Sequence, residues 1–197
     1  MNAFTYKDEG FTGLEAAIVL IAFIVVAAVF SYVVLGAGFF TTQKSQEVVH
    51  TGVQQASSTL QVVGNVYGMA PYAGGNVNNV SFTISLAPGG TPVDVSKMVI
   101  TYSTSGVLET LSLHGDETHI GNEPAAGEWN IMTVQNPRGG ATNQLLETGE
   151  QFDIKVHQTT AIAADTTFNL ELKPVVGASL DIRRTVPAGT KSLNILY

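Results

Sequence analysis

One uncharged, apolar stretch near the N-terminus restricts what this chain can fold into more than any other feature. No residue from Ala16 to Gln43 is charged, and residues 16–40 read AAIVLIAFIVVAAVFSYVVLGAGFF. At 1.5 Å per residue, a helix of that length spans about 37 Å, more than the roughly 30 Å of bilayer hydrocarbon. A lone segment in lipid must satisfy its backbone groups internally, so the stretch is predicted to be a helix. It is also too long for the apolar part of an ordinary secretory signal.

The residues that follow carry a narrower apolar stripe. Its members, spaced alternately by four and three residues, are Val49, Val53, Ala56, Leu60 and Val63. This heptad-like spacing predicts a helix with one apolar face. Because no proline precedes Pro71, one helix is predicted over residues 11–63, on the order of 80 Å long. Such a helix needs a membrane, neighbouring copies of itself, or both in succession; a membrane anchor with a helical stalk is the simplest alternative.

Composition excludes several classes of function. Only 13% of the residues are charged, against roughly 25% in ordinary soluble domains. The net charge of −7 argues against binding to nucleic acid or to an anionic lipid surface. The absence of cysteine excludes disulfides, thiolate metal ligands and cysteine nucleophiles.

Residues 64–197 read as a β domain of about the usual domain length. The glycines at 64, 68, 74 and 75, together with Pro71, indicate a linker. Seven short strands, separated by turn residues, are predicted at 80–86, 98–102, 107–113, 129–134, 151–156, 167–172 and 179–186. The predicted fold class is therefore α+β, a long hydrophobic helix followed by an immunoglobulin-like antiparallel β-sandwich.

No catalytic motif is present, so no active site, resident cofactor or metal centre is predicted. The four histidines form no arrangement with a nucleophile, and HExxH, GxSxG, P-loop and GxGxxG patterns are missing. The loop 113–123 contains His114, Asp116, Glu117, His119 and Glu123. These residues fit either a solvated loop or a weak cation site. Trp129 is predicted to lie in the sandwich core, and His50 on the polar face of the helix.

The ends of the chain resemble a known family. Residues 10–53, GFTGLEAAIVLIAFIVVAAVFSYVVLGAGFFTTQKSQEVVHTGV, are similar to the N-terminal core of the archaellins, the filament subunits of the archaeal motility organelle. The archaellins carry type IV prepilin-like, class III signal peptides. Residues 168–189, which include Lys173-Pro174 and Arg184-Thr185-Val186-Pro187-Ala188, also resemble these proteins. The middle of the chain is only loosely similar.

The resemblance implies a sequence of processing and assembly. A prepilin-peptidase-like enzyme would cut between Gly10 and Phe11, removing residues 1–10 as a leader from an inner-membrane precursor. Helix 11–63 would then leave the bilayer to form the filament core, and domain 64–197 would lie outside it. Expected partners are other copies of the chain, other archaellins, and the basal body and motor of the archaellum.

Several residues are candidates for assembly. A carboxylate inside lipid costs about 2.5 to 3.5 kcal/mol, so Glu15 needs a partner, such as the new amine of Phe11, or a place at the headgroup level. Gly36 and Gly38 precede Phe39 and Phe40, which predicts either close backbone approach between helices or a bend. The assembly candidates on the predicted stripe are Val49, Val53, Ala56 and Leu60.

One modification is expected in the outer domain. Asn79-Val80-Ser81 is an N-glycosylation sequon beside a Gly/Asn-rich loop, and archaellins are often glycosylated at such sequences. The combined prediction is an extracellular, non-enzymatic subunit of a filament rotated for swimming. The alternatives are a type IV pilus-like adhesion fibre and an uncleaved, membrane-anchored surface-binding protein.

Overall fold

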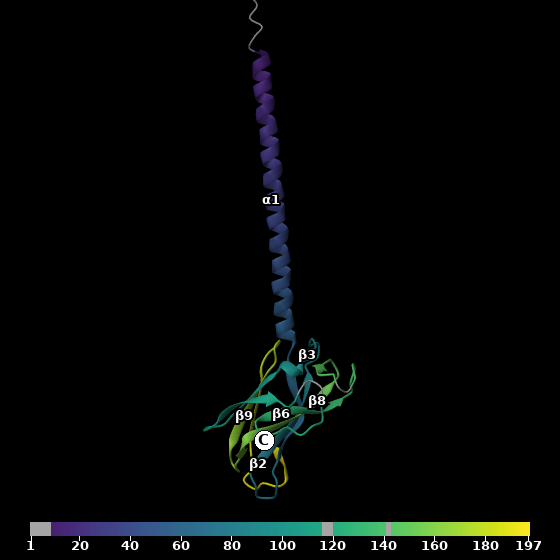
Figure 1. The fold of residues 1–197 in the computed structure, drawn as a ribbon, viewed down its shortest axis with the longest axis vertical. Helices are drawn as coiled ribbons and strands as arrows, with labels where there is room; N and C mark the ends of the chain where they lie inside the picture. Colours follow the sequence, from purple (N-terminus) through teal and green to yellow (C-terminus); the bar gives the residue numbers. More distant parts are fainter. Residues whose placement is uncertain (1–8, 116–119, 141–142) are drawn as a thin grey trace, which may run out of the picture. The chain divides into compact units, whose positions relative to one another are not determined.

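The computed structural model describes residues 9–115, 120–140 and 143–197, except the side chains of residues 9–12 and 57. It divides into two compact units at the boundary between Thr51 and Gly52. The first unit is the greater part of one helix, and the second contains the strands (Figure 1).

The secondary-structure elements follow one helix with a run of strands. In chain order they are α1 (Glu9–Ser57), β1 (Leu60–Met69), β2 (Val77–Leu86), β3 (Val93–Asp94), the 3-10 turn η1 (Val95–Lys97), β4 (Val99–Ser103), β5 (Leu108–Leu113), β6 (Glu128–Gln135), β7 (Leu145–Leu146), β8 (Gln151–Ile162), β9 (Thr167–Lys173), β10 (Leu180–Thr185) and β11 (Leu193–Leu196). All seven predicted strands are present; β8 extends six residues beyond the predicted 151–156, the other six differ from their predicted bounds by at most three residues, and β1, β3, β7 and β11 are additional.

Nine of the described strands form a sheet in the order β10-β9-β4-β5-β6-β8-β2-β1-β11. Strand β5 joins its two halves, pairing with β4 through residues 108–111 and with β6 through residues 112 and 113. The β5–β6 pair is parallel, and the other neighbouring strands are antiparallel. The predicted class, a long helix followed by a mostly antiparallel β domain, is confirmed.

One hydrophobic core lies between the two halves of the sheet. Alternate residues point inward, so Phe82 and Ile84 of β2 are buried while Ser81 and Thr83 are partly exposed. Leu170 of β9, in the other half, belongs to the same core. Trp129 of β6 is also in this core and fully buried, as predicted.

The helix ends earlier than its apolar spacing predicted. Ser58 N–H donates to the Gln54 carbonyl at 2.9 Å, and the Ala87 N–H then bonds the Thr59 carbonyl at 2.8 Å. Leu60 begins β1 and is only 2% exposed. The prediction of a helix to residue 63 was therefore wrong, since α1 ends at Ser57 and β1 begins at Leu60. Leu60-Gln61-Val62 alternates in burial as a strand does, whereas the heptad spacing had paired Leu60 with Val63.

Two of the glycines that were predicted to mark a linker, Gly64 and Gly68, lie within strand β1. Gly64 lies in β1 at a shift of register between Val63 and Tyr67, and its φ of 79° suits a bulge. Gly68, further along β1, is packed so closely that a Cβ there would lie 3.0 Å from a methyl carbon of Leu196. These glycines therefore serve the sheet, because each permits a backbone geometry or approach that a side chain would oppose.

Candidate assembly surface

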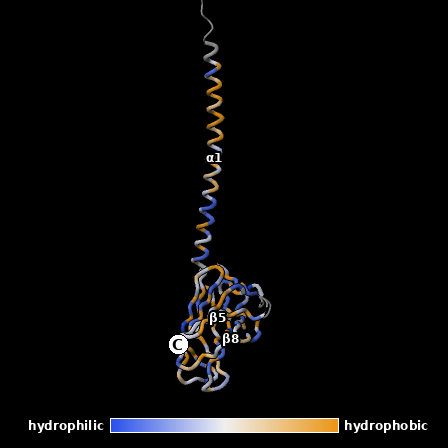
Figure 2. The backbone as a smooth tube through the Cα atoms, turned by 60° about the vertical axis from the view of Figure 1, so that its left-hand side comes forward, coloured by the Kyte–Doolittle hydropathy of each residue, from blue (hydrophilic) through white to orange (hydrophobic). Residues whose placement is uncertain are grey.

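The described side chains of helix α1 are exposed, except that of Gln54, which is partly buried. From Leu14 to Phe40 the large apolar residues are between 54% and 80% exposed. Figure 2 shows mostly hydrophobic residues along the first part of α1 and more hydrophilic residues toward its end. An exposed apolar surface of this extent marks a membrane-facing or protein-binding element.

The length and composition of α1 also suit a bilayer. Residues Gly13–Ala56 form the one helical segment, within the described residues, that is long and apolar enough to cross a membrane. Because apolar residues surround its first half, that half is able to contact lipid or neighbouring helices on every side.

Glu15 lies at the N-terminal boundary of this apolar surface. It is exposed, and the next charged residue along the helix is Lys44. Lys44 forms an ion pair with Glu47, 2.6 Å between Nζ and Oε2. The backbones of Gly10 and Phe11 lie in the first residues of α1, while their side chains are outside the described part of the structure. The predicted cut would therefore leave a chain that begins directly with helix.

The two glycines lie within an unbroken helix. Space is open around Gly36 and Gly38, where a Cβ would meet nothing within 4 Å. The hydroxyls of Thr41 and Thr42 donate to the Ala37 and Gly38 carbonyls, each at 2.8 Å, which keeps these hydroxyl donors satisfied on an apolar helix. A shallow hollow here is lined by Phe30, Ser31, Val34, Leu35, Gly38, Phe39 and Thr42. Helix α1 continues without a break through both glycines (Figure 1).

The second half of the predicted stripe is only partly a helix surface. Val49 and Val53 are exposed on α1, 61% and 60%, and Ala56 is exposed there too. Leu60 was a wrong assignment, since its side chain fills the core of the β domain. His50 is exposed on α1, as expected.

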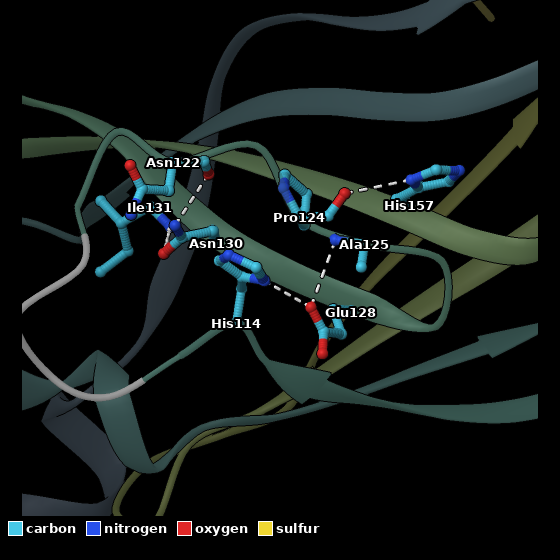
Figure 3. A network of polar contacts seen from close by, with 8 residues as sticks. All are labelled: His114, Asn122, Pro124, Ala125, Glu128, Asn130, Ile131 and His157. Atoms are coloured by element: carbon cyan, nitrogen blue, oxygen red, sulfur yellow. Dashed lines mark hydrogen bonds and ion pairs between the residues drawn. The ribbon is translucent and has the colours of Figure 1, made fainter.

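Histidine 114 and its neighbours form a polar network in the β domain (Figure 3). The His114 Nδ1 atom lies 2.5 Å from Oε2 of Glu128, which also accepts the Ala125 N–H at 3.2 Å. The hydrogen bond with His114 lowers the pKa of Glu128, with a smaller contribution from the Ala125 amide. The Asn130 side chain donates to the Asn122 carbonyl at 2.8 Å. These contacts fasten the segment before β6 to the sheet.

The cation alternative gains no support from the described part of this loop. Within it, no group of three or more carboxylate or imidazole side chains is close enough to hold a metal ion. Asp116, Glu117 and His119 lie outside the described residues. Glu123 forms an ion pair with Lys155, 2.6 Å between Oε2 and Nζ.

The sequon lies in strand β2, which begins two residues before Asn79. Asn79 is within β2 and pairs with Met69 of β1 and His157 of β8. It is on the outward side of the sheet, between core residues Val77 and Val80, and is half-buried. Its Oδ1 atom is covered and has no hydrogen-bond partner among the described residues.

The junction after α1 was not identified from the sequence. Ser58 is fully buried, its hydroxyl bonds that of Thr91, and its carbonyl accepts the Ala178 N–H at 3.3 Å. Gly177 has a φ of 111°, and a Cβ there would lie 1.8 Å from the Ser58 carbonyl oxygen. A glycine in a Gly-Ala-Ser sequence is too common a signal to have indicated this contact.

Comparison with known proteins identifies relatives along nearly the whole chain. A family model described as archaeal-type flagellin matches residues 10–184. A probable flagellin 1 of Archaeoglobus fulgidus is 40% identical over 98% of this chain and 97% of its own. The archaeal flagellum of Methanospirillum hungatei is 35% identical, with a TM-score of 0.71 over 94% of this chain and 99% of that one. An archaeal flagellin of Methanocaldococcus jannaschii, 18% identical, shares the fold with a TM-score of 0.60 over 71% of this chain and 96% of that one.

Proposed function

The chain belongs to the archaeal-type flagellin family, and from that premise we propose how its helix and its β domain serve the filament. It is a structural subunit of the archaellum filament, outside the cell, and not an enzyme. The single observation that carries this function on the chain itself is the uncovered apolar surface of α1. A subunit that polymerises through this helix removes that surface from solvent.

The energetic argument depends on where α1 lies before assembly. In water, burial of each large apolar side chain would contribute roughly 1.5 to 3 kcal/mol. In a bilayer the helix is already in an apolar environment, so association depends on close packing instead. The open space at Gly36 and Gly38 and the adjacent Phe39 and Phe40 provide such packing. We therefore place these four residues at helix-to-helix contacts, with Val49, Val53 and Ala56 continuing the surface.

Processing is the second part of the proposal. A prepilin-peptidase-like enzyme removes residues 1–10 from a membrane-inserted precursor, and the amine of Phe11 then pairs with Glu15 of its own or a neighbouring chain. The resemblance at residues 10–53 and the position of Glu15 at the edge of the apolar surface support this order. Rotation by a motor in the basal body would make the filament a propeller for swimming.

One measurement tests the processing proposal and the sequon together. Filaments are sheared from cells, and the subunit's N-terminal sequence and intact mass are determined. We expect a start at Phe11 and additional mass on the peptide containing Asn79, with the additional mass absent from a Ser81→Ala variant. A start at Met1, with the protein retained in membranes after shearing, would contradict the proposed function. An unmodified Asn79 would contradict only the glycosylation.

A further inference from the structure

Three neighbouring strands at one end of the sheet are free of charge. The strands β11, β1 and β2 lie side by side, and none of them contains Asp, Glu, Lys or Arg. Residues 58–197 together contain 12 acidic and seven basic residues, a net charge of −5. The charges of the domain are therefore elsewhere, although end strands are commonly protected by charged side chains.

Along β11, at the edge of this neutral end, the outward side is also apolar. Leu193, Ile195 and Tyr197 are 56%, 40% and 81% exposed. Ile195 pairs directly with Tyr67 of β1, which is half-buried on the same outward side. We call Tyr67, Leu193, Ile195 and Tyr197 the β11 patch.

The β11 patch is held in a fixed conformation. Strand β11 is in register with β1, and the Asn194 side chain donates to the Gly68 and Lys191 carbonyls at 3.3 and 2.6 Å. The Tyr197 carbonyl accepts the Thr185 N–H of β10 at 2.7 Å. Because the strand is already ordered, a partner binding here would lose little conformational entropy from it.

We propose that the β11 patch is a contact surface for the outer domain of a neighbouring subunit in the filament. The inference rests on the proposed function, since the filament brings copies of the domain together at high effective concentration. Two domains of net charge −5 repel each other, and the electrostatic repulsion is smallest where they approach through a neutral, apolar face. A second copy thus fits the surface better than a charged partner does.

The absence of native cysteine allows a direct test with single-cysteine variants. Ile195→Cys reports on the patch, and Leu108→Cys is the matched control. Leu108 of β5 is an exposed aliphatic residue, 78%, that pairs with Ser103 and lies in the other half of the sheet. Each variant is labelled with a small maleimide, first in purified filaments and then after mild detergent dissociates them. Trp129 fluorescence confirms that the dissociated domain stays folded.

We expect Ile195→Cys to react at least about tenfold more slowly in filaments than in dissociated subunits, since reaction would require local opening of the contact. The control rate should change little, and it also corrects for detergent binding. Equal labelling of Ile195→Cys in both states would overturn the inference while leaving the proposed function intact. Failure of the parent chain to form filaments would instead contradict the proposed function.

Two further outcomes would show that something other than a second copy of the chain covers the β11 patch. A glycan on Asn79 would lie beside Met69, next to the patch. If protection of Ile195→Cys disappears when Ser81→Ala removes the sequon, a sugar rather than a second copy covers it, and the inference is wrong. Protection that exists on cells but is lost in purified filaments would also overturn it, by assigning the contact to another surface component.

Discussion

At the residue scale, Glu15 places a carboxylate where α1 becomes continuously apolar. An unpaired carboxylate inside the membrane costs about 2.5 to 3.5 kcal/mol, and pairing in the filament would relieve that cost. Because alanine removes this contribution to assembly, we predict that Glu15→Ala lowers the amount of assembled filament by about tenfold or more. The measurement is the ratio of sheared to membrane-bound subunit. Glu47→Ala removes an exposed acid from the same helix and is the matched control. Equal ratios for the two variants would favour Glu15 at the headgroup level instead.

Glu128 gives the β domain a dependence on acid pH. Its pKa is lowered in the folded state, so its ionised form contributes stability that is present above the unfolded pKa near 4.5 and is lost as the pH falls through the folded pKa. We predict that Glu128→Gln lowers the free energy of unfolding at neutral pH, and that the difference from the parent chain diminishes in acid. Urea unfolding of the solubilised subunit at several pH values measures this. Glu171→Gln, on β9, is the charge-matched control; a difference independent of pH would refute the prediction.

At the element scale, the junction between α1 and β1 depends on a close backbone contact. We predict that Gly177→Ala destabilises the β domain by about 1 to 3 kcal/mol, because alanine is strained at a φ of 111° and its Cβ would overlap the Ser58 carbonyl. Denaturation of the full-length subunit in detergent is followed by the fluorescence of Trp129, the one tryptophan of the chain. Gly106→Ala, where a Cβ meets nothing within 4 Å, is the control. Similar stabilities for both variants would argue against a tight junction.

At the scale of the whole molecule, the distribution of charge and the absence of cysteine determine what dissociates the filament. The part of α1 from residue 16 to 43 has no charge, and no disulfide is possible. We predict that reductant and high salt leave filaments assembled, whereas mild detergent releases subunits because it replaces the apolar contacts of the helix. Sedimentation after each treatment measures this. Release by salt alone would indicate that contacts between charged groups hold the helices together.

The apolar helix and the seven predicted strands could be predicted from local sequence patterns. An uncharged run beyond the length of a bilayer leaves few structures other than a helix, and alternation of apolar residues with turn signals identifies strands such as β2 and β9. The positions on α1 of the proposed assembly residues from Glu15 to Ala56 could be predicted for the same reason. Each of them lies on one continuous element whose periodicity places its side chains.

By itself, therefore, the sequence determined the long helix, the β domain and the family, because these depend on composition, local periodicity and residue motifs. The tertiary structure decided where α1 ends, since Leu60 fits both the heptad spacing with Val63 and a strand alternation with Val62, and burial of Leu60 in the core selects the strand. It also decided the parallel β5–β6 pair, the contact of Gly177 with Ser58 and the neutral end formed by β11, β1 and β2. These features join residues distant in the sequence, and no local pattern specifies which distant strand or carbonyl will be the neighbour.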